Sequence, residues 1–107
     1  MEAQIFNFST WIDETSPRKL EREFERMLRT SGFSIIGFVN HHYTPYGYSA
    51  VWLVAESHFA VHSFPEEKTT YIELSSCNER MFKRFKSIIE EMYGPVPDEI
   101  KKEDGKT

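Results

Sequence analysis

The segment at residues 48–55 constrains the fold more than any other, because the strand that it predicts is apolar on both faces. Side chains alternate between the two faces of a strand, so Val51 and Leu53 lie on one of them. Trp52 and Val54 lie on the other, and both faces need apolar partners. Helices of the same chain can cover one face. We expect the other face to meet the sheet of a second copy, which predicts a homodimer.

A first amphipathic helix is predicted to begin at Pro17 and to end before Gly32. Ser16 is a suitable N-cap, proline is favoured at the first helical position, and glycine commonly follows the last turn. The apolar face of this helix has helical spacing and consists of Leu20, Phe24, Met27 and Leu28. The opposite face alternates acidic and basic side chains, which is typical of a face exposed to solvent.

A second amphipathic helix follows Asn78, its expected N-cap, and ends at Gly94 and Pro95. Its apolar face consists of Met81, Phe82, Phe85, Ile88, Ile89 and Met92. Further strands are predicted at residues 4–8, 33–40, 59–64 and 69–74. The order of elements predicts an α+β fold, a two-layer sandwich in which a mainly antiparallel sheet carries two helices on one face. The charged segment 98–107 is expected to be a tail.

The length of 107 residues predicts a single domain at residues 1–107. A single cysteine excludes a disulfide within the chain and a zinc site of four thiolates, and it favours a cytoplasmic protein. We expect no signal peptide and no membrane span, because the first residues lack a basic and apolar leader and no apolar run is long enough. The chain carries 13 basic and 17 acidic side chains, a net charge of −4, so nucleic acid is not an expected partner.

Four histidines, His41, His42, His58 and His62, are the first candidates for a metal site. His58 and His62 would share a face of a regular strand, but they would lie roughly 13 Å apart, too far for one metal ion. No cysteine or carboxylate stands at ligand spacing from them, so we expect no metal. Cys77 by itself is more often a small buried side chain than a nucleophile.

A joint pattern changes the interpretation of these residues. The sequence Glu-Ser-His at residues 56–58 follows an apolar strand, and an aromatic stretch with a glycine precedes it at residues 41–49. The serine is followed five residues later by His62 and twenty residues later by Cys77. This set of residues and spacings resembles the small prokaryotic S-adenosylmethionine decarboxylases, and the resemblance runs over about residues 33–93.

The resemblance implies that the chain makes its own cofactor. The Ser57 hydroxyl would attack the carbonyl before it, turning the Glu56–Ser57 amide into an ester, and β-elimination would then divide the chain into residues 1–56 and 57–107. The second fragment would begin with a pyruvoyl group derived from Ser57. That group would form a Schiff base with a substrate amine and accept electrons as carbon dioxide leaves.

The resemblance also implies roles for individual side chains. His62 would be the base that removes the Cα proton, and Ser49 would assist processing. Cys77 would be the acid that reprotonates the substrate carbon, a role that suits a thiol whose ordinary pKa is about 8.5. Tyr43 stands at an aromatic position that stacks on adenine in the family, and Glu66 at an acidic position near the substrate.

The implied activity is decarboxylation of S-adenosylmethionine, a small amino-acid-type substrate, for polyamine (spermidine) biosynthesis. The implied assembly is a homodimer with four layers, α/β/β/α, and with the site between two sheets. Residues 64–66 read Phe-Pro-Glu where the family has Trp-Pro-Glu, and residues 75–78 read Ser-Ser-Cys-Asn where it favours Phe-Thr-Cys-Gly. These differences leave two alternatives open, a pyruvoyl-dependent arginine or ornithine decarboxylase on the same scaffold and a non-catalytic regulatory paralogue.

Overall fold

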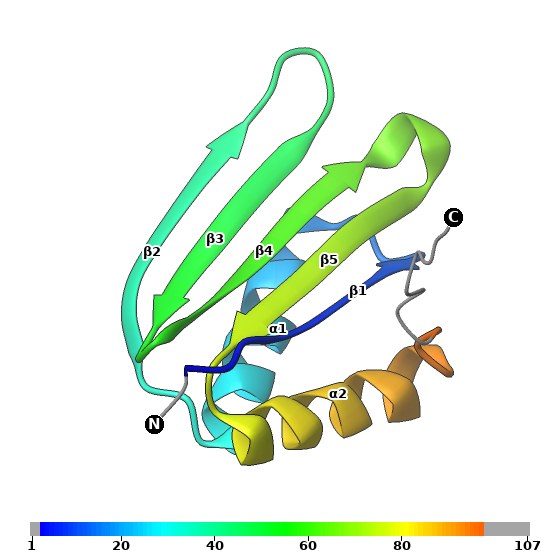
Figure 1. The fold of residues 1–107 in the computed structure, drawn as a ribbon. Helices are drawn as coiled ribbons and strands as arrows, with labels where there is room; N and C mark the ends of the chain where they lie inside the picture. The colour runs from blue at the N-terminus through cyan, green and yellow to red at the C-terminus, as the bar shows by residue number, and fades with distance from the viewer. Residues whose placement is uncertain (1–2, 98–107) are drawn as a thin grey trace, which may run out of the picture.

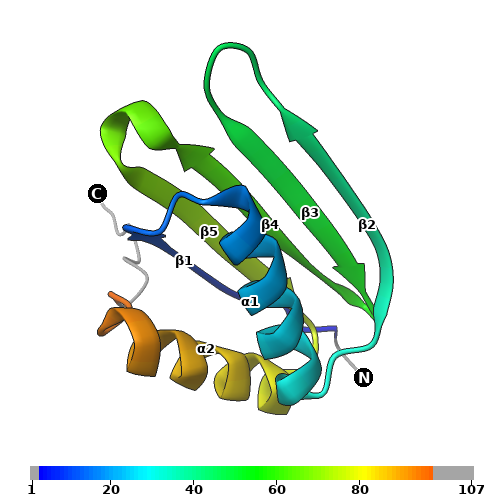
Figure 2. The ribbon, with the colours of Figure 1, turned by 180° about the vertical axis from the view of Figure 1, so that it is seen from behind.

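The structure, a computed structural model, describes residues 3–97 and contains one five-stranded sheet with two helices on a single face (Figure 1, Figure 2). The elements in chain order are β1 (Phe6–Ile12), α1 (Pro17–Ser31), β2 (Ile35–His42), β3 (Tyr48–Val54), β4 (Ser57–Phe64), the short 3-10 helix η1 (Pro65–Glu67), β5 (Thr69–Ser76) and α2 (Glu79–Tyr93). The strands lie in the order β1-β5-β4-β3-β2, and every neighbouring pair is antiparallel. The α+β fold and the order of its elements are confirmed, and the predicted tail 98–107 lies outside the described residues.

Both helices begin and end where their sequences predict. The Ser16 side chain accepts a hydrogen bond from the backbone N–H of Lys19 at 3.4 Å, and the Asn78 side chain accepts one from the third residue after it at 3.0 Å. Each bond satisfies an N–H group that has no partner inside the first helical turn. Gly32 ends α1 in the left-handed conformation, with φ 105°, and its N–H donates to the carbonyl of Arg29.

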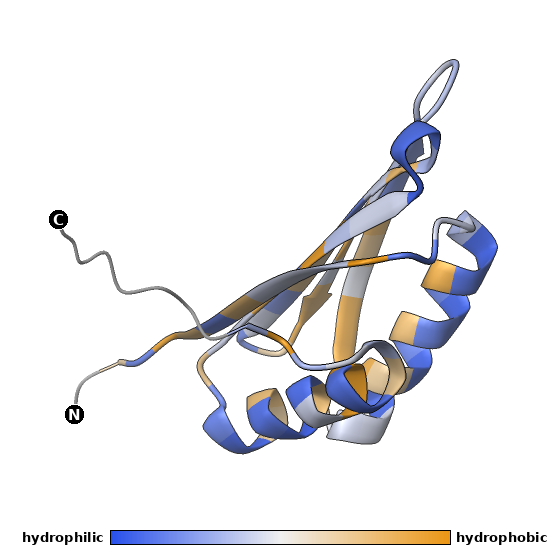
Figure 3. Cartoon of the chain, turned by 90° about the vertical axis from the view of Figure 1, so that its right-hand side faces the viewer, coloured by the Kyte–Doolittle hydropathy of each residue, from blue (hydrophilic) through white to orange (hydrophobic). Residues whose placement is uncertain are grey.

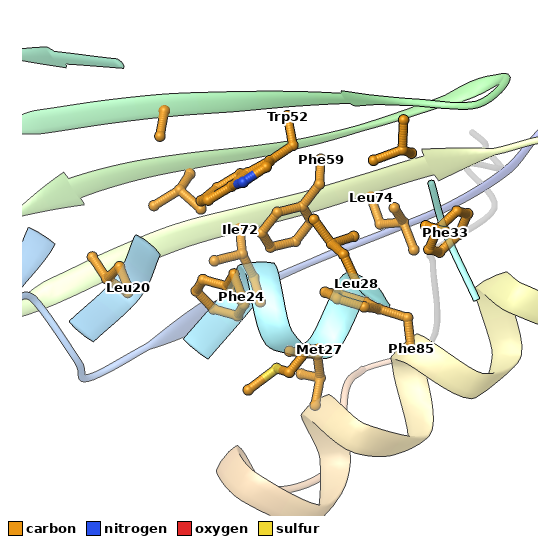
Figure 4. Packing of buried hydrophobic residues seen from close by; sticks show 14 of the residues in the cluster. Leu20, Phe24, Met27, Leu28, Phe33, Trp52, Phe59, Ile72, Leu74 and Phe85 are labelled. Carbon is orange, nitrogen blue, oxygen red and sulfur yellow. The ribbon is translucent and has the colours of Figure 1, made fainter. Parts of the chain in front are cut away.

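The core lies between the helices and the sheet, where Trp52 of β3 and Phe59 of β4 are fully buried (Figure 4). Their ring centroids lie 5.7 Å apart. Phe59 also contacts Phe24 of α1 at 4.9 Å and Phe85 of α2 at 5.0 Å. One aromatic side chain therefore links both helices to the middle of the sheet, and the helices cover the face of β3 that carries Trp52.

Several strand ends differ from the prediction. β1 runs to Ile12 instead of residue 8, β2 lies two residues later than expected, and β3 ends one residue earlier, at Val54. β4 starts at Ser57 instead of residue 59, and β5 continues to Ser76 instead of residue 74. The reason is backbone pairing, since Ser57 and Ser76 are partners at the end of the β4–β5 ladder. Hydrogen bonds extend a ladder through polar side chains, which carry no apolar signal.

One residue of the predicted apolar face of α2 does not belong to the core. Met92 is 46% exposed, whereas Phe82, Phe85 and Ile89 of the same face are buried. Met92 lies in the last turn of the helix and, with Trp11, lines a surface hollow. The helical spacing of apolar residues extends to Met92, but the buried part of this face ends before it.

No element among residues 3–97 covers the second face of the sheet, which is seen edge-on in Figure 3. We call it the open face. Strand register places Val39, Val51 and Ala60 across the middle of this face, on β2, β3 and β4. Val39 is 65% exposed and Leu53, on the same face of β3, is 52% exposed. Contiguous apolar exposure of this kind commonly marks an interaction surface, and this is the face that the sequence predicts to pack against a second copy.

Replacing Gly32 with alanine tests the end of α1. An L-residue is strained at φ 105°, so Gly32→Ala should lower the free energy of unfolding by roughly 1–2 kcal/mol in urea denaturation. Gly37→Ala is the matched control, because no atom lies within 4 Å of the added Cβ. The control should change stability by less than about 0.5 kcal/mol. Equal losses in the two variants would contradict this account.

Candidate functional site

The peptide bond between Glu56 and Ser57 lies in the tight turn that joins β3 to β4. Val54 and Ser57 are the last paired residues of the two strands, so only two residues form the turn. Glu56 has φ 59°, a left-handed conformation that costs a residue other than glycine roughly 1–3 kcal/mol. The carbonyl that Ser57 is predicted to attack therefore belongs to a strained residue.

The Ser57 hydroxyl points to the helix side of the sheet and is buried. It donates a hydrogen bond of 2.7 Å to Oγ of Ser76, its partner across the ladder. Ser76 Oγ also accepts a hydrogen bond of 3.0 Å from the backbone N–H of Asn78. These bonds hold the Ser57 hydroxyl in one position beside the turn.

Cys77 contacts Glu56, the residue that supplies the carbonyl of the same peptide bond. Its Sγ is 3.4 Å from the carbonyl oxygen of Glu56 and 3.2 Å from Oε1 of the Glu56 carboxylate. The hydrogen bond to that carboxylate, together with burial and the negative charge, raises the pKa of the Cys77 thiol above its ordinary value. At neutral pH Cys77 is therefore a thiol, the form that donates a proton. We call Glu56, Ser57, Ser76 and Cys77 the turn cluster.

A second group of predicted residues lies at the opposite end of the strands. Register places five side chains in one row across the open face, in the order His41, Ser49, His62, Tyr71 and Trp11. Ser49 Oγ is 2.8 Å from Nδ1 of His62, and the Tyr43 hydroxyl donates to Ser49 Oγ at 3.3 Å. We call Tyr43, Ser49 and His62 the histidine cluster.

A hollow of about 380 Å³ opens beside the histidine cluster. Its lining consists of Tyr43, Tyr46, Gly47, Tyr48, Ser49, His62, Ser63, Phe64 and Glu66. The two predicted substrate contacts, Tyr43 and Glu66, thus lie in the same hollow. Aromatic rings beside a carboxylate suit a ligand that carries a positive charge and a planar group.

The structure does not bring the two clusters together within one chain. Ser57 and His62 lie five residues apart on β4, roughly 16 Å at the rise of a strand. An odd spacing also places them on opposite faces, Ser57 toward the helices and His62 on the open face. A site that uses both residues needs more than one chain.

The structure adds two side chains that the sequence interpretation did not single out. Ser76 holds the Ser57 hydroxyl. The sequence could have indicated this residue, because it is a hydroxyl residue directly before Cys77, where the family that the chain resembles favours threonine. Tyr71 stacks on His62 with the planes 23° apart and the centroids 6.3 Å apart. Only strand register reveals the second contact, because the two residues are distant in sequence and belong to different strands.

Neither a cluster of metal ligands nor a membrane-spanning helix is found among the residues that the structure describes. Residues 3–97 hold no group of three or more His, Cys, Asp or Glu side chains that could bind a metal ion. Across the same residues, neither helix is long and apolar enough to cross a membrane.

Known proteins match this chain in sequence. The family model described as S-adenosylmethionine decarboxylase matches residues 12–101. The S-adenosylmethionine decarboxylase proenzyme of Thermotoga maritima is 35% identical over 60 residues, which make up 56% of this chain and 46% of that protein. The proenzyme of Acidithiobacillus ferrooxidans is 35% identical over 51 residues, 48% of this chain and 38% of that protein. The chain spans about half the length of the curated relatives it matches, or less.

A solved structure matches the fold. The crystal structure of the adenosylmethionine decarboxylase from Aquifex aeolicus superposes with a TM-score of 0.70, covering 89% of this chain and 84% of that chain. The two sequences are 16% identical in this comparison, so the likeness concerns the fold.

The contact between Glu56 and Cys77 predicts how the thiol titrates. The Glu56 carboxylate disfavours the thiolate, so Glu56→Gln should lower the pKa of Cys77 and raise its reactivity at neutral pH. The change is made in a Ser57→Ala background, which keeps the chain whole, and the rate of alkylation by iodoacetamide is followed against pH. The midpoint should move to lower pH in Glu56→Gln and stay in place in the control Glu67→Gln. An unchanged or higher midpoint in Glu56→Gln would refute the assignment.

Proposed function

The chain belongs to the S-adenosylmethionine decarboxylase family, and on that premise we propose that it is a pyruvoyl-dependent decarboxylase that processes itself between Glu56 and Ser57. S-adenosylmethionine is the proposed substrate, and polyamine biosynthesis is the proposed role. The observation that carries the proposal is the turn cluster. It joins a strained Glu56, a serine hydroxyl next to the scissile carbonyl and a protonated thiol on the carbonyl oxygen.

Glu56 and Ser57 of the turn cluster supply the atoms that react in self-cleavage, and Cys77 is proposed to act afterwards, in turnover. Ser57 Oγ adds to the carbonyl carbon of Glu56, the C–N bond breaks, and the hydroxyl proton ends on the freed nitrogen, which leaves an ester. A base then removes the Cα proton of Ser57. The bond between Cβ and Oγ of Ser57 breaks, and the main-chain carboxylate of Glu56 leaves as the new C-terminus of the first fragment. Water releases ammonia from the new terminus and completes the pyruvoyl group. Left-handed strain at Glu56 favours cleavage, because the strain is relieved once the chain is cut.

Cys77 stays beside the new terminus after cleavage. A pyruvoyl group supplies a carbonyl that binds the substrate amine and takes up electrons as carbon dioxide leaves. The raised pKa keeps the Cys77 thiol protonated at neutral pH, so it is suited to return a proton to the substrate carbon. Tyr43 and Glu66 are proposed to hold the rest of the substrate through stacking and charge.

The base for the Cα proton is proposed to come from a second protomer. His62 lies roughly 16 Å from Ser57 of its own chain and on the other face of the sheet. The open face presents His62 toward one end of the strands, Val39 over their middle and Leu53 toward the β3–β4 turn. Two open faces packed together would bury this apolar surface and bring histidines of each protomer into the interface.

The direction of such packing follows from the positions of the two clusters. Val51 and Ala60 pair with each other near the middle of the strands, and the two clusters lie on either side of that level. A two-fold axis that crosses the strands there reverses their direction. It sets His62 of one protomer over the end of β4 that carries the partner's Ser57. The proposed assembly is therefore a homodimer in which each site combines both chains.

Self-processing is tested by the intact mass of the purified protein. The wild-type chain should give two fragments, residues 1–56 and 57–107, because the strained Glu56 and the Ser57 hydroxyl are both in place. Ser57→Ala should give one uncleaved mass, since no hydroxyl is left to attack. Ser34→Ala, an exposed serine outside the cluster, should still give two fragments. A single uncleaved mass for the wild type would reject the proposed function.

The shared site is tested by mixing two inactive variants. Ser57→Ala and His62→Ala should each remain uncleaved when purified alone. Mixed and allowed to exchange subunits, they form heterodimers in which one site joins the intact Ser57 of one chain to the intact His62 of the other. Cleavage should then appear in the His62→Ala chain only, as read by mass. If the wild type cleaves itself but the exchanged heterodimers do not, the proposal that each site combines Ser57 of one chain with His62 of the other is rejected.

The substrate is tested by release of carbon dioxide. Processed protein is incubated separately with S-adenosylmethionine, arginine and ornithine, and S-adenosylmethionine should react fastest. Cys77→Ala should leave cleavage largely intact and slow turnover by about 10²–10⁴-fold, the contribution of a positioned acid. Faster turnover of arginine or ornithine would reassign the substrate, and normal turnover in Cys77→Ala would remove its role as the acid.

A further inference from the structure

The hydroxyl of Tyr43 is an unassigned part of the histidine cluster. It donates to Ser49 Oγ at 3.3 Å, and Ser49 Oγ lies 2.8 Å from Nδ1 of His62. The three groups form one chain of hydrogen bonds that ends on a ring nitrogen. Stacking with a ligand would need only the ring of Tyr43, so a phenylalanine would serve that purpose equally well.

The ring of Tyr43 is held in place from two sides. Gly47 has φ 115°, and a Cβ on it would lie 3.3 Å from Cδ2 of Tyr43, so the ring packs closely against the Gly47 backbone and an added side chain would crowd it. The backbone N–H of Tyr43 donates to the carbonyl of Gly47 at 2.9 Å and closes the loop. On β2, the ring of His41 meets that of Tyr43 edge-on, with centroids 4.6 Å apart. These contacts direct the hydroxyl of Tyr43 toward Ser49.

The direction of the hydrogen bonds follows from the chemistry of the two hydroxyls. A phenol is more acidic than an alkyl alcohol, so it is the better donor and the poorer acceptor. The Tyr43 hydroxyl therefore donates to Ser49, and the Ser49 hydroxyl donates onward to Nδ1 of His62. An imidazole that accepts at Nδ1 carries its proton on Nε2 when it is neutral.

We propose that Tyr43 is a positioning residue that sets the tautomer of His62, through Ser49, to the form protonated on Nε2. The inference rests on the proposed function and deepens it. In this form His62 presents an N–H to the partner's peptide bond at residues 56–57. It can donate a hydrogen bond to the oxygen that becomes negative when the partner's Ser57 attacks.

The same three groups explain how His62 could also act as a base. Both hydroxyls can rotate. When Nε2 gives its proton to water and Nδ1 takes one from water, the reversed chain runs from Nδ1–H of His62 to Ser49 and from Ser49 to Tyr43. That direction leaves Nε2 free to accept a proton. Tyr43 sets the balance between the two directions, because its hydroxyl is the stronger donor of the pair.

The tautomer is measured on the full chain labelled with ¹⁵N-histidine, in a Ser57→Ala background that keeps it whole. His62→Gln identifies the signals of His62 among the four histidines. Long-range ¹H–¹⁵N spectra should show Nδ1 unprotonated and Nε2 protonated. In Tyr43→Phe the two ¹⁵N shifts should move toward each other, because Ser49 no longer receives a directing hydrogen bond. In the control Tyr46→Phe, a tyrosine of the same hollow whose hydroxyl makes no hydrogen bond within the described residues, they should stay as in the parent.

The outcomes separate this inference from the proposed function. Unchanged His62 shifts in Tyr43→Phe, or a parent chain protonated on Nδ1, would overturn the role of Tyr43 whether or not the chain cleaves itself. With Ser57 restored, Tyr43→Phe should slow self-cleavage by about 3- to 10-fold, the value of one hydrogen bond. Cleavage at the wild-type rate would also overturn it. Failure of the wild type to cleave would reject the proposed function, and the spectra would still decide the tautomer.

Discussion

A sheet with two apolar faces and helices for only one of them is the constraint on which the rest of this molecule depends. Trp52 and Phe59 anchor the helix layer, and Phe24 and Phe85 reach them from the two helices. Burial of these rings holds the strands in a defined register. On the other face the same strands present apolar side chains, including Val39, to solvent. The surplus of apolar surface connects the fold to its proposed assembly.

Strand register decides which side chains of the candidate site meet. The two-residue turn after β3 strains Glu56 and brings Cys77 from the end of β5 against its carbonyl oxygen. The pairing of Ser57 with Ser76 holds the hydroxyl that is proposed to attack. Five residues further along β4 the side chain points the other way, so the histidine belongs to the opposite face. A single strand thus carries two parts of the proposed site, and it cannot join them within one chain.

Most of the fold could be predicted, since its determinants are local. The caps Ser16 and Asn78 and the terminator Gly32 acted through neighbouring backbone groups, and the structure has them in those roles. The strand ends were less predictable, because ladder hydrogen bonds carried β5 through Ser76 without any apolar signal. Met92 kept the helical period but is exposed and lies outside the core, which periodicity alone does not reveal.

The sequence by itself determined the elements, the two-sided character of β3 and the residue types of the candidate site, since spacing and side-chain chemistry are properties of the linear chain. The tertiary structure alone decided which of those residues meet. It joined Cys77 to Glu56 across 21 positions and Tyr43 to His62 through Ser49, and it separated His62 from Ser57. The physical reason is that contacts between strands depend on register and face, and these are fixed only when the whole sheet packs on its helices.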